Sequence, residues 1–210
     1  MGYVFEELIR KFNEENNEEA GEHFTPRDII ELMGQLIFHP ITDAIQSTTY
    51  LVYDPACGSG GMLTEAERVL QELGGKTHKK VNLRLYGQEI NPETNAICQS
   101  DMLIKGRDPA DIKHGSTLSQ DGHSAMRFDF MLSNPPYGKS WNSDEAAIRD
   151  TKKEITDNRF KVGVPRTSDG QLLFLMTMLS KMKHDTPLGS RAVTRQVVEA
   201  ARESLVIGQF

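Results

Sequence analysis

The chain has 210 residues, of which 38% are hydrophobic, so it is long enough to form one globular domain with a sizeable core. Its formal net charge of -6 is unfavourable for binding nucleic acid unaided, because phosphate contacts need positive charge. Any such contacts are therefore local, or another subunit supplies the positive charge. No segment approaches the roughly 20 apolar residues of a membrane span, and the N-terminus lacks the features of a secretory signal. We therefore expect no membrane association.

Two cysteines, Cys57 and Cys98, are too few for a disulfide framework, and their positions do not match zinc-ligand spacing. A cytoplasmic location is therefore the default expectation, and no metal site is predicted. Cys57 has no paired base that the sequence reveals, so we interpret it as a small packed side chain rather than a nucleophile.

Apolar residues recur at helical spacing over residues 3–15 and again over residues 27–38. Thr25 and Pro26 suit the N-cap and the first helical position of the second of these helices. Further along the chain, strands are predicted at residues 51–53, 83–89 and 129–133, and helices at residues 61–73, 92–105 and 170–183. Strands alternating with helices indicate the α/β class with a mainly parallel sheet. We expect a helical N-terminal segment over residues 1–48, followed by one α/β domain over residues 49–210.

Two further segments give weaker patterns. Residues 139–168 are polar and charged with few apolar anchors, which predicts a mobile segment. Residues 192–199 have a pattern that is more typical of a helix than of a strand.

Residues 54–61 form a dense glycine turn between a predicted strand and a predicted helix. Its glycines allow the backbone to approach a ligand closely. The segment lacks the Gly-Lys-Ser/Thr ending of a phosphate-binding loop and the spacing of a dinucleotide site. The alternative is an ordinary glycine turn with no ligand.

Glu89 ends the second predicted strand, and a carboxylate in this place can accept both hydroxyls of a ribose. The alternative is that Glu89 caps the helix that follows. Together with the glycine turn, the ribose interpretation is favoured. Because no cradle for a pyrophosphate is evident, S-adenosylmethionine fits this pair of features better than NAD.

Asn134, Pro135, Pro136 and Tyr137 follow the third predicted strand. Consecutive prolines stiffen the turn, and the side chain of Asn134 adds a neutral carbonyl. A planar group that bears an NH2 fits this corner, because carbonyl oxygens accept its hydrogens while its ring stacks on Tyr137. The arrangement suits methylation of a poorly nucleophilic heterocyclic amine. The alternative is a proline-rich turn without a catalytic role.

These motifs occur in the order His23–Arg27, Asp54–Gly61, Gln88–Pro92 and Asn134–Lys139. In this combination the chain resembles amino-group DNA methyltransferases and, more narrowly, the modification subunit of type I restriction-modification systems. The resemblance covers roughly residues 1–190. It implies a Rossmann-like sheet of seven strands with helices on both faces, S-adenosylmethionine as cofactor and N6-methyladenine as product. It also implies four partners: DNA, a DNA specificity subunit, a second modification subunit and a restriction subunit.

The resemblance also assigns roles to residues. Asn134, Pro135, Pro136 and Tyr137 would handle an adenine extruded from the duplex. The cofactor would be held by residues from four segments: Phe24, Thr25, Pro26, Asp54, Pro55, Ala56, Gly58, Ser59, Gly60, Glu89, Ile90 and Ser116. Of these, Glu89 would bind the ribose, and the first and second segments would hold the methionine end.

Two departures from the family pattern stand out. Related enzymes often carry an acid after Gly115, where it meets the adenine amine of the cofactor, and this chain has Ser116. A hydroxyl also accepts a hydrogen bond, although less strongly than a carboxylate. After Arg191 the family continues into an apolar strand that the sequence here does not resemble. We therefore expect a fragment whose sheet is incomplete at the C-terminus.

Two other functions remain open on the sequence alone. A methyltransferase acting on protein glutamine or on RNA would also use an Asn-Pro-Pro-Tyr corner, although the segment from His23 to Pro26 argues against it. The chain could also be a fragment that binds cofactor or partner subunits without turnover. The DNA target cannot be read from the sequence, because the family assigns recognition to another subunit.

Overall fold

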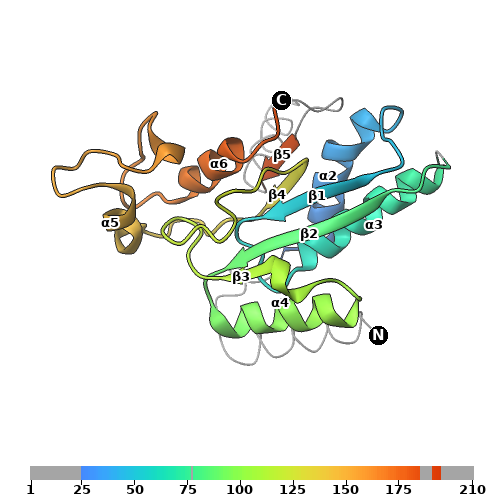
Figure 1. Cartoon of the computed structure of the whole chain (residues 1–210), viewed down its shortest axis with the longest axis horizontal. Coiled ribbons are helices and arrows are strands. Elements are labelled where there is room, and N and C mark those ends of the chain that lie inside the picture. The colour runs from blue at the N-terminus through green and yellow to red at the C-terminus, as the bar shows by residue number, and fades with distance from the viewer. Residues whose placement is uncertain (1–24, 77, 185–190, 195–210) are drawn as a thin grey trace, which may run out of the picture.

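The computed structural model describes residues 25–76, 78–184 and 191–194. The helix predicted over residues 3–15 and the candidate residue Phe24 lie outside the described residues. The described part folds as a parallel sheet with helices packed on both of its faces (Figure 1). The α/β class expected from the sequence is therefore confirmed.

The sheet has five described strands in the order β3-β2-β1-β4-β5, and every neighbouring pair is parallel. Its strands are β1 (Thr49–Asp54), β2 (Asn82–Glu89), β3 (Ile112–His114), β4 (Phe130–Ser133) and β5 (Arg191–Thr194). The three predicted strands are confirmed as β1, β2 and β4. The short edge strands β3 and β5 were not predicted. Strand β3 has three residues and one apolar side chain, and the sequence around β5 has a pattern more typical of a helix.

The helices are α2 (Arg27–Phe38), α3 (Gly61–Lys76), α4 (Pro92–Ile104), α5 (Glu145–Ile148) and α6 (Gln171–Ser180). Short 3-10 turns occur at His39–Ile41, Pro109–Asp111, Asn142–Asp144 and Asn158–Phe160. The prediction for α2 is correct in its bounds. Thr25 is not its N-cap, however: Pro26 occupies that position and has no polar side chain with which to cap, and the Thr25 hydroxyl accepts from Asn134 instead.

The strands alternate their side chains between two cores, as the period of two requires. On one face Val52, Leu85 and Phe130 pack against α2, α3 and α4. On the other face Tyr53 and Met131 pack with Tyr86, Phe128 and Met178, the last of which lies on α6. Helix α2 shares its core with α3 and lies on the same face of the sheet (Figure 1). Thr25, which precedes α2, contacts Asn134 after β4. The domain boundary expected near residue 48 stays a prediction.

The segment of residues 139–168 is folded, so the expectation of a mobile segment was wrong. A third core cluster holds it against α6 and the loop after β3, with Leu118, Trp141, Ile148, Phe160 and Leu173 buried. Arg159 adds two bonds of 2.7 Å, which its guanidinium donates to the carbonyls of residues 117 and 118. A few widely spaced anchors are sufficient because each is almost completely buried.

The prediction of a helix after residue 191 was also wrong over the described residues. The backbone of Arg191–Thr194 pairs with β4 from Phe130 to Ser133 as strand β5. The open edge of β4 offers unpaired backbone groups, and pairing with them overrides a weak helical pattern. The five described strands are fewer than the seven that the family resemblance implies. Within the described residues, none of the helices is long and apolar enough to cross a membrane.

Candidate active site

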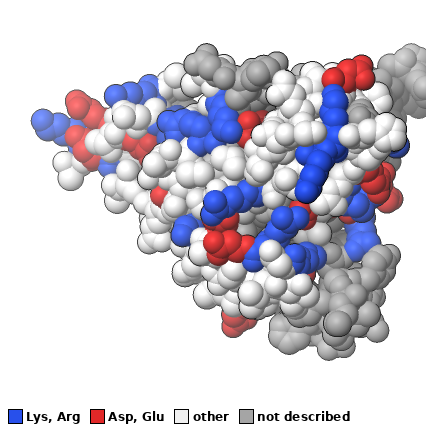
Figure 2. Space-filling model, turned by 45° about the vertical axis from the view of Figure 1, so that its right-hand side comes forward, with Lys and Arg blue, Asp and Glu red and all other residues white. Residues whose placement is uncertain are grey.

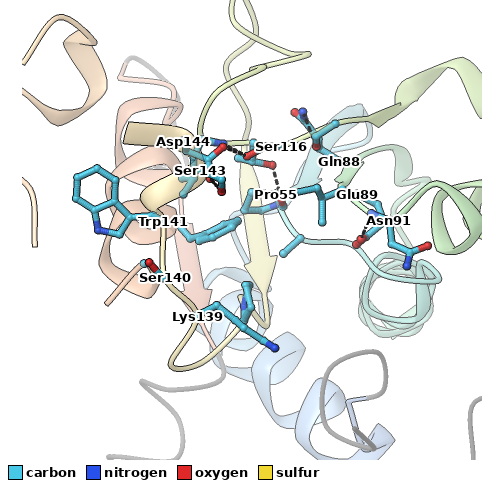
Figure 3. A pocket seen from close by; sticks show the side chains of 18 of the residues that line it. Pro55, Gln88, Glu89, Asn91, Ser116, Lys139, Ser140, Trp141, Ser143 and Asp144 are labelled. Atoms are coloured by element: carbon cyan, nitrogen blue, oxygen red, sulfur yellow. Dashed lines mark hydrogen bonds between the residues drawn. The ribbon is translucent and has the colours of Figure 1, made fainter. Parts of the chain in front are cut away.

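The candidate site lies at the carboxyl ends of the strands, where open parallel sheets bind ligands. The chain runs from β1 outward to β2 and β3, and then returns to the other side of β1 as β4, so the strand order reverses between β1 and β4. A cavity of about 480 Å³ opens at this edge. Its volume falls in the range typical of small-molecule sites, roughly 300–1,000 Å³. Its lining comes from the ends of β1, β2, β3 and β4 and from the segment after β4 (Figure 3).

The glycine turn is held by hydrogen bonds from its backbone amides to the end of β2. The Cys57 amide donates to the Gln88 carbonyl at 3.0 Å, and the Gly58 amide donates to Glu89 Oε2 at 3.0 Å. Gly58 has φ 53° and Gly60 has φ 87°, and a Cβ on Gly60 would lie 2.8 Å from Cys98 Sγ. Glycine is therefore required at residue 60 both by the backbone conformation and by the packing of α4.

Glu89 joins this turn to the start of α4. Its Oε1 accepts from the Asn91 amide at 2.8 Å, while Oε2 accepts from Gly58. The helix is capped by Asn91, whose side chain accepts from the amides of Glu93 and Thr94. The alternative role of Glu89 as the helix cap is therefore wrong. Its carboxylate lines the cavity and has further lone pairs with which to accept ligand hydroxyls.

Asp54 lies behind the cavity wall and is 1% exposed. Its Oδ1 accepts from the Ala56 amide at 2.9 Å and from the Ser133 hydroxyl at 2.8 Å. Burial raises the pKa of Asp54 to about 7, and these two hydrogen bonds offset part of the rise. Asp54 thus ties the ends of β1 and β4 together and can take up or release a proton near neutral pH.

At the end of β4, the side chain of Asn134 is oriented by Thr25. Asn134 Nδ2 donates to Thr25 Oγ1 at 3.0 Å, across 109 positions of sequence. Because the side-chain nitrogen of Asn134 is used in this bond, the side-chain oxygen Oδ1 is the atom that can accept a hydrogen bond from a ligand. Asn134 and Pro136 line the cavity, and Tyr137 is 77% exposed beside it. An exposed aromatic ring leaves a face for stacking.

Ser116 is hydrogen-bonded to the carboxylate of Asp144, a residue that was not predicted to belong to the site. Its hydroxyl donates to Asp144 Oδ1 at 2.7 Å and accepts from the Leu118 amide at 3.2 Å. Asp144 is 8% exposed and lines the cavity, in the 3-10 turn Asn142–Asp144. In Figure 3, Ser116, Ser143 and Asp144 form one group, and Glu89 and Asn91 form another, with Pro55 between them.

The structure brings seven of the predicted site residues to the cavity wall: Pro55, Ala56, Glu89, Ile90, Ser116, Asn134 and Pro136. Asp54, Thr25 and Gly58 support them through the hydrogen bonds above, whereas Pro26, Ser59, Gly60, Pro135 and Tyr137 do not line the cavity. Sequence reasoning missed the wall that residues 139–174 provide: Lys139, Ser140, Trp141, Ser143, Asp144, Gly170 and Phe174. Trp141, the single tryptophan in a polar stretch, was the available signal.

Cys57 is buried against Gly87: a Cβ added to Gly87 would lie 2.7 Å from Cys57 Sγ. Both cysteines are free thiols. A hydrogen bond with Cys98, together with burial, raises the pKa of the Cys57 thiol well above its usual value. It is therefore a packed side chain rather than a nucleophile. Among the described residues, no group of three or more metal-ligating side chains could hold a metal ion.

The fold is that of the S-adenosylmethionine-dependent methyltransferases. The modification-system methyltransferase subunit of Streptococcus thermophilus has a similar solved structure, with a TM-score of 0.66 and 26% identity over 88% of this chain and 36% of that one. The family model for N-6 DNA methylases matches residues 1–194. The chain therefore belongs to the N-6 DNA methylase family.

Two curated relatives of the chain are methylase subunits of type I restriction enzymes. The chain is 28% identical, over 195 residues, to the type I restriction enzyme HindI methylase subunit of Haemophilus influenzae. It is 33% identical, over 171 residues, to the MpnII methylase subunit of Mycoplasma pneumoniae. These alignments cover 92% and 77% of this chain. The chain spans 39% and 29% of the lengths of these two relatives.

Proposed function

We propose that the chain is the catalytic module of an adenine-N6 DNA methyltransferase that works within a type I restriction-modification complex. The observation that carries the proposal is the hydrogen bond from the Asn134 amide nitrogen to Thr25, at the wall of a cavity that Glu89 also lines; it leaves the amide oxygen of Asn134 as an acceptor. An acceptor for an amine and an acceptor for a ribose thus share one site. The family membership and the relatives support the same function.

The cavity fits S-adenosylmethionine. Glu89 would bind the ribose hydroxyls, because its carboxylate lines the cavity with lone pairs beyond those used by Gly58 and Asn91. Pro55 and Ala56 would hold the methionine end, and Asp54 supports them by accepting from the Ala56 amide. Ile90, Leu118 and Phe174 offer apolar contact for a purine ring. When bound, this cofactor supplies the methyl group.

The polypeptide's own contribution is to hold and polarise the target amine. Positive charge develops on the amine nitrogen as it gains a fourth bond, and the Asn134 Oδ1 would accept a hydrogen bond that strengthens with that charge. The hydrogen bond to Thr25 restrains the amide of Asn134, which favours a preorganised acceptor. Tyr137, with its ring 77% exposed, would stack on the extruded base.

The target is proposed to be duplex DNA, recognised with a specificity subunit, a second modification subunit and, for cleavage, a restriction subunit. On the face shown in Figure 2, basic side chains are interspersed with acidic ones over the described residues and form no continuous basic area. Together with the net charge of -6, this arrangement calls for a partner that supplies most of the phosphate contacts. The two free thiols suit the reducing cytoplasm, where we place the protein.

The proposed function is tested by methyl transfer in the assembled complex. The full-length modification subunit that carries these residues is combined with its specificity subunit, duplex DNA and S-adenosylmethionine, and the modified nucleoside is identified by mass spectrometry. We expect N6-methyladenine in DNA. Transfer to RNA or to a protein glutamine under the same conditions, with none to DNA, would overturn the proposal in favour of the alternative substrate.

A further inference from the structure

Asp144 is a buried carboxylate in the cavity wall, and its place at the start of a short helix does not explain its burial. It occupies the N-cap position of α5, yet its side chain makes no capping hydrogen bond. One oxygen, Oδ1, accepts from the hydroxyls of both Ser116 and Ser119. Within the described part of the chain, the other oxygen, Oδ2, has one long contact of 3.4 Å with Ser143. The serines therefore fix the carboxylate through one oxygen and leave the second with acceptor capacity.

The position of Asp144 along the cavity follows from the order of the strands. Along the strand ends, Asn134 follows β4, Pro55 follows β1, Glu89 ends β2 and Ser116 follows β3, which is the order of the strands in the sheet. The Gly115 amide donates to the Glu89 carbonyl at 2.9 Å, which places the β3 end directly beside the β2 end. A nucleoside whose ribose is at Glu89 and whose sulfur is nearer Asn134 must therefore place its base at the β3 end.

We infer that Asp144 is a cofactor-binding residue that accepts a hydrogen bond from the exocyclic amine of the cofactor's adenine, with Ser116 and Ser119 as positioning residues. The inference rests on the proposed function. A carboxylate without a proton accepts hydrogen bonds and donates none, so it selects an NH2 and disfavours a carbonyl at the same ring position. The acid is supplied from a separate turn, 28 positions beyond Ser116. The segment of residues 139–170 is thus part of the cofactor site.

The test compares two ligands that differ at one ring position. S-Adenosylhomocysteine carries an amine at carbon 6 of the purine, and S-inosylhomocysteine carries a carbonyl there. Their affinities are measured by calorimetry on the 210-residue chain and on three variants, each checked by thermal melting. The wild type is expected to prefer the adenosyl ligand by roughly 10- to 100-fold, as hydrogen bonds to charged groups imply.

Asp144→Ala should lower the affinity for the adenosyl ligand by about the same factor. The affinity for the inosyl ligand should stay unchanged or rise slightly. Asp144→Asn, of equal size, gives the sharper result. The two serine hydroxyls would hold the amide oxygen in place of Oδ1, so the amide NH2 would face the ring and the preference should reverse toward the inosyl ligand. Asp111→Ala is the matched control, since Asp111 is equally buried, pairs with Arg84 and lies outside the cavity. It should keep the wild-type preference.

The outcomes separate the two proposals. If the wild type binds neither ligand, the proposed function fails and the assignment of Asp144 fails with it. If the wild type binds the adenosyl ligand but both Asp144 variants keep its preference, or lose both ligands equally, only the assignment of Asp144 is overturned. Loss of preference in Asp144→Ala with reversal in Asp144→Asn supports the assignment.

Discussion

The two walls of the cavity are built in different ways. The wall formed by the glycine turn and Glu89 is joined by hydrogen bonds to backbone amides, from Gly58 and Asn91, directly at the ends of β1 and β2. The wall formed by residues 139–170 is held by side chains such as Trp141, Ile148 and Phe160, which are far apart in sequence. The first wall is determined by local backbone requirements, and the second depends on tertiary packing. The two should therefore fail differently when they are mutated.

Trp141→Ala should have the largest effect. Trp141 is 1% exposed, and its indole nitrogen donates to the Arg166 carbonyl at 2.9 Å. Removal of a buried tryptophan costs about 3–5 kcal/mol. We expect the loss to fall on residues 139–170, with faster amide exchange there and little change in β1 and β2. Hydrogen exchange read by mass spectrometry, with Trp141→Phe as a milder control, checks this. Equal acceleration in the sheet would show that the two walls unfold together.

Asn134→Ala should lower the single-turnover rate of the assembled complex by about 10²–10³, the usual cost of losing one preorganised transition-state partner. Cofactor affinity should change little, because Asn134 acts on the target amine. Tyr137→Phe is the control and should be mild, since the stacking face survives. If Asn134 merely orders the turn, melting temperature would fall while turnover per folded molecule stayed the same.

Glu89→Ala should weaken the binding of S-adenosylmethionine by about 1.5–3 kcal/mol, or roughly 10- to 100-fold in affinity, because charge-assisted hydrogen bonds are lost. It also removes acceptors from the amides of Gly58 and Asn91, so melting temperature should fall too. Glu89→Gln keeps one acceptor oxygen and should lose less of both. Calorimetry and thermal melting on the same preparations measure the two effects. Unchanged affinity in a folded Glu89→Ala chain would exclude Glu89 from the ribose site.

The pH dependence of stability that Asp54 causes should be the smallest effect when it is expressed per pH unit. Burial raises the pKa of Asp54 from 3.8 to about 7, so between these values the folded chain binds a proton that the unfolded chain has released. The contribution of this proton to the free energy of unfolding is fully present below the unfolded-state pKa. It is lost as pH rises through the folded-state pKa, by at most about 1.4 kcal/mol per pH unit. Asp54→Asn should remove this part of the dependence of unfolding free energy on pH. The part that Glu67 contributes should remain, because burial raises the pKa of Glu67 as well. Urea unfolding of both proteins across this interval measures it, and identical slopes would contradict the assignment.

Much of the first wall was predictable from the sequence alone. Strands β1, β2 and β4, the helices between them, the glycine turn, Glu89 and Asn134 were all identified, because each follows from local features. Glycine at a positive φ, proline in a turn and apolar runs of strand length act over a few residues and leave a readable pattern. The order of these motifs along the chain then indicated the family, which the comparisons confirm.

The tertiary structure alone decided the second wall and the two edge strands. The polar composition of residues 139–168 predicts mobility, yet burial of a few side chains against α6 orders the segment. Likewise, β5 forms because the edge of β4 is available for backbone pairing. The hydrogen bonds from Asn134 to Thr25 and from Ser116 to Asp144 join residues 109 and 28 positions apart, and no local pattern records such pairs. Local propensity determined which elements form, and the burial of distant side chains determined which residues meet at the site.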